Sequence, residues 1–148
     1  MALSNHNPFQ ETQTQFFSGE AASVHRFLAV MQESGIIFCI LTPRGEMQEV
    51  SPSWQNFTGQ EENESRGRGW LEAFHPADQP QIEAMLIQTV ASGLSSEHTL
   101  QMRRYDESYR LMHLRLVPVR EPSGAISELV AVGTDITMQE LAKQMSEA

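Results

Sequence analysis

The clearest pattern in the sequence is an alternation of apolar and polar residues between positions 98 and 137. Leu100 and Met102 alternate with polar neighbours in a first run, and Met112 and Leu114 do so in a second run. Successive side chains of a strand point to opposite faces of a sheet, so a period of two gives each run one apolar face. The pattern therefore predicts β-strands that pack one face on a core.

Two polar turns and a third apolar run complete this part of the chain. Residues 105–108 and 121–124 are polar, and the second of these stretches contains Pro and Gly, as turns commonly do. The apolar run at residues 126–133 follows the second turn. Three antiparallel strands are the expected result.

A helical period appears earlier in the chain, at residues 20–34. Apolar residues recur there at steps of three and four, which predicts an amphipathic helix whose stripe contains Val24, Phe27, Leu28 and Met31. A symmetric contact would let this stripe cover its own copy in a second chain. We therefore expect a homodimer through these helices.

The segments on either side of this helix differ in composition. Residues 1–19 are polar without a sustained period, which predicts a mobile leader. Residues 36–41 are apolar without alternation, which predicts a strand covered on both faces, and residues 46–50 return as a second strand. Cys39 is the sole cysteine, so no internal disulfide can form, and its apolar surroundings favour a buried thiol in a reducing compartment.

Helices are predicted between these strands and the alternating region. A short helical turn is expected around residues 54–57 and another at 61–65. A longer helix is expected over residues 79–92, where Asp78 and Gln81 have the spacing of a capping box. The capping role explains Asp78 better than a metal-ligand role does.

A last helix begins after the final strand, over residues 138–148. Thr137 and Glu140 have capping-box spacing, and Asp135 stands where the strand becomes the helix. A carboxylate at this place can accept free backbone N–H groups at the helix start.

Length and charge limit the classes of function. A chain of 148 residues is one domain with tails, and its net charge of −9 argues against a nucleic-acid or anionic-membrane surface. The apolar runs are far shorter than the roughly 20 residues of a membrane span, and no secretion signal is visible. We expect a cytoplasmic protein.

The order of the elements, with several short motifs, resembles a PAS domain over about residues 35–137. The motifs are the Trp54 turn, the sequence His75-Pro76-Ala77-Asp78, the hairpin Arg103-Arg104-Tyr105-Asp106, the sequence Pro118-Val119-Arg120, and the closing Asp135-Ile136-Thr137. The chain departs from the family pattern at four positions, where Thr42, Ser51, Glu107 and Leu111 replace the usual Asp, Asn, Gly and Trp.

The resemblance implies an α+β fold with a five-stranded antiparallel sheet in the order 2-1-5-4-3, helices over one face, and flanking N-terminal and C-terminal helices. It also implies a small pocket between helices and sheet, with His98 as its polar anchor. The matching wall would consist of Phe57, Trp70, Leu86, Val90, His98, Leu100, Met102 and Leu114. Such a wall suits a small apolar ligand, and the alternative is that these side chains fill the space.

The cofactors used elsewhere in the family find few matching residues here. Flavin photoreceptors of the light-oxygen-voltage group carry an Asn-Cys-Arg-Phe-Leu-Gln stretch, where this chain has residues 65–71 without cysteine. Haem-binding relatives commonly ligate iron from a histidine on the long helix, and residues 79–92 contain none. A flavin adduct and helix-ligated haem are therefore disfavoured, and the cofactor stays open.

Two function classes follow. The first is a sensory and dimerisation module without enzymatic activity, which passes the state of a ligand or partner through the C-terminal helix to an effector domain such as a histidine kinase or a cyclic-nucleotide enzyme. In the resembled family the junction that Asp135 and Thr137 match couples the sheet to what lies downstream. The alternative is a small enzyme or ligand carrier in which His98 acts in an apolar pocket.

Overall fold

The computed structural model describes residues 25–26, 29–30, 33 and 35–147, and the chain divides into two compact units, Met1–Ser34 and Gly35–Ala148. In the first unit, the five described residues are helical. The predicted leader and the four residues proposed for the dimer contact lie outside the described residues; these four are Val24, Phe27, Leu28 and Met31.

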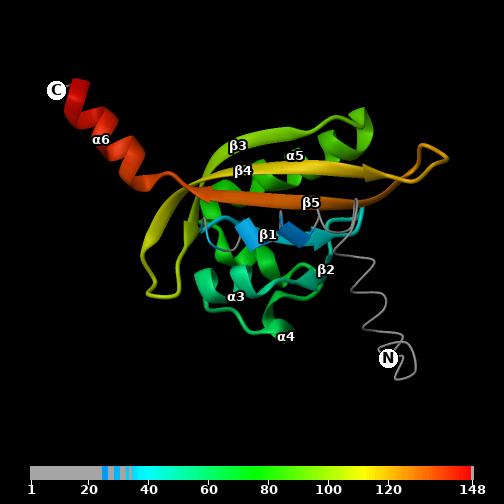
Figure 1. Ribbon diagram of the computed structural model, residues 1–148, viewed down its shortest axis with the longest axis horizontal. Helices are drawn as coiled ribbons and strands as arrows, with labels where there is room; N and C mark the ends of the chain where they lie inside the picture. Colours follow the sequence, from blue (N-terminus) through cyan, green and yellow to red (C-terminus); the bar gives the residue numbers. More distant parts are fainter. Residues whose placement is uncertain (1–24, 27–28, 31–32, 34, 148) are drawn as a thin grey trace, which may run out of the picture. The chain divides into compact units, whose positions relative to one another are not determined.

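The second unit contains one antiparallel sheet of five strands in the order β2-β1-β5-β4-β3 (Figure 1). This confirms the predicted topology and the α+β class. The strands are β1 (Ile37–Leu41), β2 (Met47–Val50), β3 (Ser96–Arg103), β4 (Tyr109–Arg120) and β5 (Ile126–Asp135). The helical elements are α3 (Pro52–Thr58), α4 (Glu62–Ser65), η1 (Gly69–Ala73), η2 (Pro76–Asp78), α5 (Gln79–Ser92) and α6 (Thr137–Glu147).

Strand β1 shows which face of the sheet carries the core. Ile37, Cys39 and Leu41 are buried, whereas Phe38 and Ile40 on the opposite face are half-buried. The inner face of this strand is therefore covered as predicted, and the covering of its outer face by the N-terminal helix or a second subunit stays a prediction. On the inner face, burial raises the pKa of the Cys39 thiol well above its ordinary value, which keeps the thiol protonated.

Three aromatic residues from the short helices cover the centre of the inner face. Trp54, Trp70 and Phe74 are each 2% exposed or less, and their ring centroids lie 5.9–6.4 Å apart. Both Trp70 contacts are edge-to-face, an arrangement that aromatic rings favour over direct stacking. The indole nitrogen of Trp54 donates to Gln60 at 2.9 Å, and that of Trp70 donates to the Gly45 carbonyl at 2.9 Å.

The start of α5 differs from the prediction. Asp78 does not cap the helix: its carboxylate accepts the Gln101 N–H of edge strand β3 at 2.7 Å. The 3-10 turn η2 runs directly into α5, so Asp78 already has helical backbone angles instead of the extended ones of a capping residue. His75 makes the local cap, because its Nδ1 accepts the Ala77 N–H at 3.0 Å.

The turn between β3 and β4 holds one strained residue. Glu107 has a φ of 69°, in the left-handed region that glycine adopts without strain. Asp106 accepts hydrogen bonds from Arg104 and Ser108 beside it, and these donors lower the pKa of its carboxyl. The local bonds hold the turn although Glu107 stands where the family pattern has glycine.

A matched pair of methionines tests the assignment of the core. Met112 on β4 is 1% exposed, so Met112→Ala should lower the free energy of unfolding by about 2–5 kcal/mol through the cavity that it leaves. Met138 on α6 is 68% exposed, and the same replacement there should change this free energy by less than about 0.5 kcal/mol. Urea denaturation followed by circular dichroism measures both values. Equal losses would contradict the placement of the core.

Candidate functional site

Most residues of the predicted pocket wall belong to the packed core. Five of them, Trp70, Leu86, Leu100, Met102 and Leu114, are 4% exposed or less and contribute to the core cluster. Phe57 is partly buried and packs against that cluster. This placement agrees with the alternative interpretation, in which these side chains fill the space between helices and sheet.

His98 does not occupy the interior. It lies opposite the buried Leu114 in the β3–β4 register, but its side chain is exposed. The prediction of a buried polar anchor at this position is therefore wrong. The alternation places His98 on the inner face, but β3 is the edge strand of the sheet, where a side chain has strand neighbours on one flank only.

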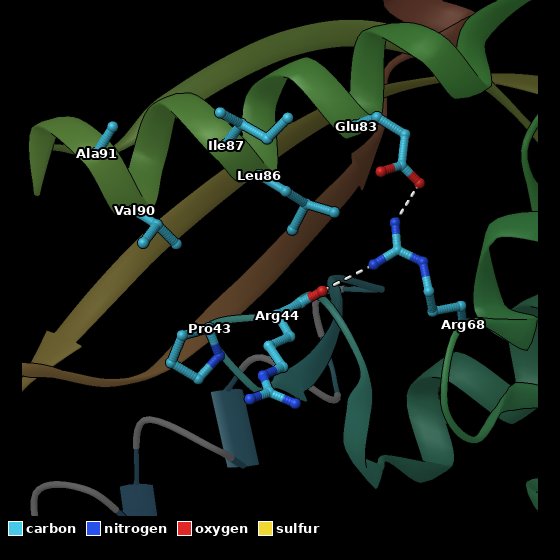
Figure 2. A pocket seen from close by; sticks show the side chains of 8 residues that line it. All are labelled: Pro43, Arg44, Arg68, Glu83, Leu86, Ile87, Val90 and Ala91. Carbon is cyan, nitrogen blue, oxygen red and sulfur yellow. Dashed lines mark hydrogen bonds and ion pairs between the residues drawn. The ribbon is translucent and has the colours of Figure 1, made fainter.

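Leu86 and Val90 line a groove at the surface, between the β1–β2 turn and α5 (Figure 2). The groove has a volume of about 520 Å³. Its other lining residues are Pro43, Arg44, Arg68, Glu83, Ile87 and Ala91. An apolar wall from α5 thus faces a turn that carries arginine.

Hydrogen bonds from outside the turn fix its position. Arg68 donates one hydrogen bond to the Arg44 carbonyl at 2.7 Å and another to the carboxylate of Glu83 on α5 (Figure 2). Gly45 has a φ of 82°, and a Cβ atom there would stand 2.8 Å from Cδ1 of Leu86. Glycine is therefore required at this position, both for the backbone conformation and for the close approach of α5.

This groove was not predicted from the sequence, although the pattern of apolar residues in and just after α5 indicates it. Ile87 and Val90, three residues apart on α5, are 70% and 36% exposed, and Leu94 just past the end of the helix is 69% exposed. The two helical residues add an exposed apolar surface beside the buried stripe, and such a surface indicates a further contact. Arg44 and Arg68, which line the other side of the groove, are distant from α5 in the sequence. No sequence pattern therefore indicated that they lie beside this helix.

A second arrangement of polar groups joins the end of the sheet to α6. The carboxylate of Asp135, the last residue of β5, accepts a hydrogen bond from Nε of Arg110 at 2.8 Å. It also accepts hydrogen bonds from the backbone N–H of Thr137 at 3.0 Å and from the Thr137 hydroxyl at 2.6 Å. The hydroxyl oxygen of Thr137 accepts the Leu111 N–H at 2.8 Å, and the Ile136 N–H donates to the Leu111 carbonyl at 2.8 Å. Strands β4 and β5 and the first turn of α6 are therefore bonded at one place.

The helix cap at this junction also differs from the expected capping box. The Thr137 hydroxyl is engaged with Asp135 and Leu111, and the Glu140 N–H donates to the Ile136 carbonyl. The acceptor at the helix start is Asp135 itself. Partial burial works against its charge, but the donors on Thr137 and Arg110 outweigh it and hold the pKa of the Asp135 carboxyl below its ordinary value.

Among the residues that the structure describes, no cluster of three or more His, Cys, Asp or Glu side chains could hold a metal ion. Within the same residues, no helix combines the length and apolarity that crossing a membrane requires.

Comparison with known proteins places most of the second unit, Gly35–Ala148, in one family. The family described as PAS fold matches residues 48–133. An uncharacterized protein of Sinorhizobium fredii, y4lL, is 27% identical over 94 residues, which cover 64% of this chain and 11% of that protein. The chain thus spans about a tenth of the length of this relative.

Solved structures show the same fold. The N-terminal domain of a diguanylate cyclase with PAS/PAC sensor from Marinobacter aquaeolei has a TM-score of 0.60 and 18% identity, over 71% of this chain and 98% of that one. A sensory box histidine kinase/response regulator from Burkholderia thailandensis has a TM-score of 0.63 and 18% identity, over 82% and 92%. At such identities the likeness shows the fold alone.

The lowered pKa of Asp135 predicts how the junction responds to acid. The stabilisation that Asp135 contributes should be fully present above the ordinary aspartate pKa of about 3.9 and should be lost as the pH falls through the lower folded-state value. The backbone amide resonance of Thr137 reports this midpoint in an NMR titration. Arg110→Gln should raise the midpoint, because it removes one donor. A midpoint at or above the ordinary value in the unmodified protein would contradict the arrangement.

Proposed function

The chain belongs to the PAS fold family, and from this premise we propose that it is a sensory and dimerisation module of a signal-transduction protein. The module changes state with a small ligand or a protein partner and passes that state through α6 to an effector domain. Relatives of the same fold include parts of a diguanylate cyclase and of a histidine kinase, which supports an effector of either kind. A cytoplasmic location agrees with a free, buried cysteine.

The junction at Asp135 carries this proposal. Its carboxylate is bonded both to Arg110 on β4 and to Thr137 on α6, so a shift of β4 against β5 moves the acceptor that holds the first turn of the helix. A helix of 11 residues is marginal in water without such contacts. Small changes in the sheet can therefore alter the direction and order of α6.

The exposed side of α6 supports a connection to further structure. Met138, Leu141 and Met145 are 68%, 47% and 78% exposed and recur at steps of three and four. An apolar stripe of this kind is suited to pairing with another helix. We assign it to the effector side of the module.

No observation on the described residues favours the alternative of a small enzyme. Its proposed acid-base residue, His98, is exposed. Asp78 and Asp135 are engaged elsewhere, Asp78 with the Gln101 N–H and Asp135 with the helix junction.

The coupling role of Asp135 can be tested in a chimera. Residues 1–148 replace the sensory domain of a histidine kinase, and α6 continues in register into the kinase helix. If the lost contacts together shift the balance between the states of α6 by on the order of 1 kcal/mol, Asp135→Ala should change the autophosphorylation rate about fivefold in either direction. The melting temperature should fall by no more than about 4 °C.

The matched control is Asp106→Ala, which also removes a carboxylate paired with arginine, but in the β3–β4 turn. It should leave the kinase rate unchanged. Equal effects of the two variants on the kinase rate would show that the output does not pass through the junction.

The proposed homodimer rests on the apolar stripe of residues 20–34. Light scattering should find a dimer at about 10–50 μM, which is above the micromolar Kd of a weak dimer. Replacing Phe27 and Leu28 with Glu should give monomers, whereas the same double replacement at Met138 and Leu141 of α6 should leave the dimer intact. A monomeric unmodified protein, or a dimer disrupted only by the α6 variant, would contradict the proposal.

A further inference from the structure

The groove between the β1–β2 turn and α5 combines an apolar wall with the guanidinium of Arg44, which makes no ion pair with any described residue. We propose that it binds a soluble amphipathic carboxylate, with the anionic head at Arg44 and an apolar body along α5. The wall from Leu86 to Ala91 runs along about 8 Å of the helix, which fits an unbranched body of about seven carbons beyond the carboxylate. This inference names the ligand class of the proposed sensor, and its meaning as a signal rests on that proposed function.

The apolar wall consists of Leu86, Ile87, Val90 and Ala91 on the second half of α5, and Ile87 is exposed. A neighbouring groove of about 360 Å³ shares Pro43, Val90 and Ala91 with the first one, but Ser92, Arg120 and backbone groups make most of its remaining lining polar. The apolar surface for a ligand therefore lies in the first groove. A hydrocarbon body lying on this wall would remove apolar surface of both partners from water.

Charge selects the head group. The side chain of Arg44 is exposed and has no hydrogen bond or ion pair within the described part of the chain, whereas its backbone N–H donates to Thr42 and its carbonyl accepts from Arg68. Arg68 is held beside it by Glu83, so the two arginines and one glutamate leave the groove a net charge of +1 (two positive, one negative). On a chain with a net charge of −9, this is a local site for an anion.

The size of the groove and the packing of the core favour a small ligand in this place. A volume of about 520 Å³ is within the range of small-molecule sites, roughly 300–1,000 Å³. The interior positions where a ligand was expected are taken by core side chains such as Trp70 and Met102. A ligand that binds at the surface between α5 and the β1–β2 turn needs no rearrangement of this core.

The test is an NMR titration of the full chain with sodium octanoate, with 1-octanol as the uncharged probe of the same length. Octanoate should shift the methyl resonances of Leu86, Ile87 and Val90, and octanol should bind at least about fivefold more weakly because it lacks the charge. Arg44→Gln should raise the Kd for octanoate about fivefold to tenfold and leave the fold intact. Arg103→Gln, at an exposed arginine outside the groove, should leave the Kd unchanged.

Three results would overturn the inference. Equal affinities for octanoate and octanol would mean that the arginines select no anion. Shifts at Met102 and Leu114 instead of the groove methyls would place the ligand in the interior. In the ligand-free protein, nuclear Overhauser contacts from the groove methyls to another segment of this chain or to a second copy would show that the groove is already occupied.

The failure of this inference and that of the proposed function are distinguishable. Binding is read from the groove resonances, whereas output is read from the kinase rate of the Asp135→Ala chimera. Octanoate that binds nowhere overturns the ligand assignment and leaves the coupling test untouched. Octanoate that binds at the groove supports the assignment even if Asp135→Ala leaves the kinase rate unchanged.

Discussion

The inner face of the five-stranded sheet has to be kept from water, and between β2 and β3 the chain provides one long helix, α5, to do so. Helix α5 covers part of that face, and the short elements between β2 and α5 supply the rest through their aromatic side chains. Trp54, Trp70 and Phe74 are large enough to close the gap that short helices leave. The interior is consequently filled by the protein's own rings, and the groove with the apolar wall lies at the surface, between α5 and the β1–β2 turn.

Filling a core with tryptophan brings a second requirement, since each buried indole N–H needs an acceptor. The indole of Trp54 donates to the side-chain carbonyl oxygen of Gln60, which also accepts a hydrogen bond from the Ser65 hydroxyl. The indole of Trp70 donates to the backbone carbonyl of Gly45. Within the described residues no buried side-chain polar atom is without a partner. The β1–β2 turn therefore takes its position from the core, and the groove beside it is a by-product of how that core satisfies its polar atoms.

The strands were predictable because their signal is local. The period of two at Leu100, Met102, Met112 and Leu114 sets the buried face of β3 and β4 whatever lies above it. The order of the strands in the sheet was predicted from the resemblance to the PAS family, which in turn rests on the order of the elements along the chain. The family matched by residues 48–133 and the strand order both confirm this part.

The polar details were not predictable, because each depends on a neighbour remote in sequence. Asp78 binds Gln101, and Thr137 binds Leu111, so both leave the local capping roles that spacing alone suggests. The alternation places His98 on the inner face of the sheet, but the side chain is exposed because β3 is an edge strand. The period of two does not show which strand lies at the edge. Arg44 and Arg68 are brought together across 24 positions by the turn that Trp70 holds.

The hydrogen bond from Trp70 to the Gly45 carbonyl also makes the protein its own optical probe. Indole emission moves to longer wavelength when the ring meets water, and Trp54 and Trp70 are both shielded from it. One of the two is tied to the residue next to Arg44. Any event that displaces this turn changes the surroundings of that indole, so the intrinsic fluorescence of the unlabelled protein follows the groove.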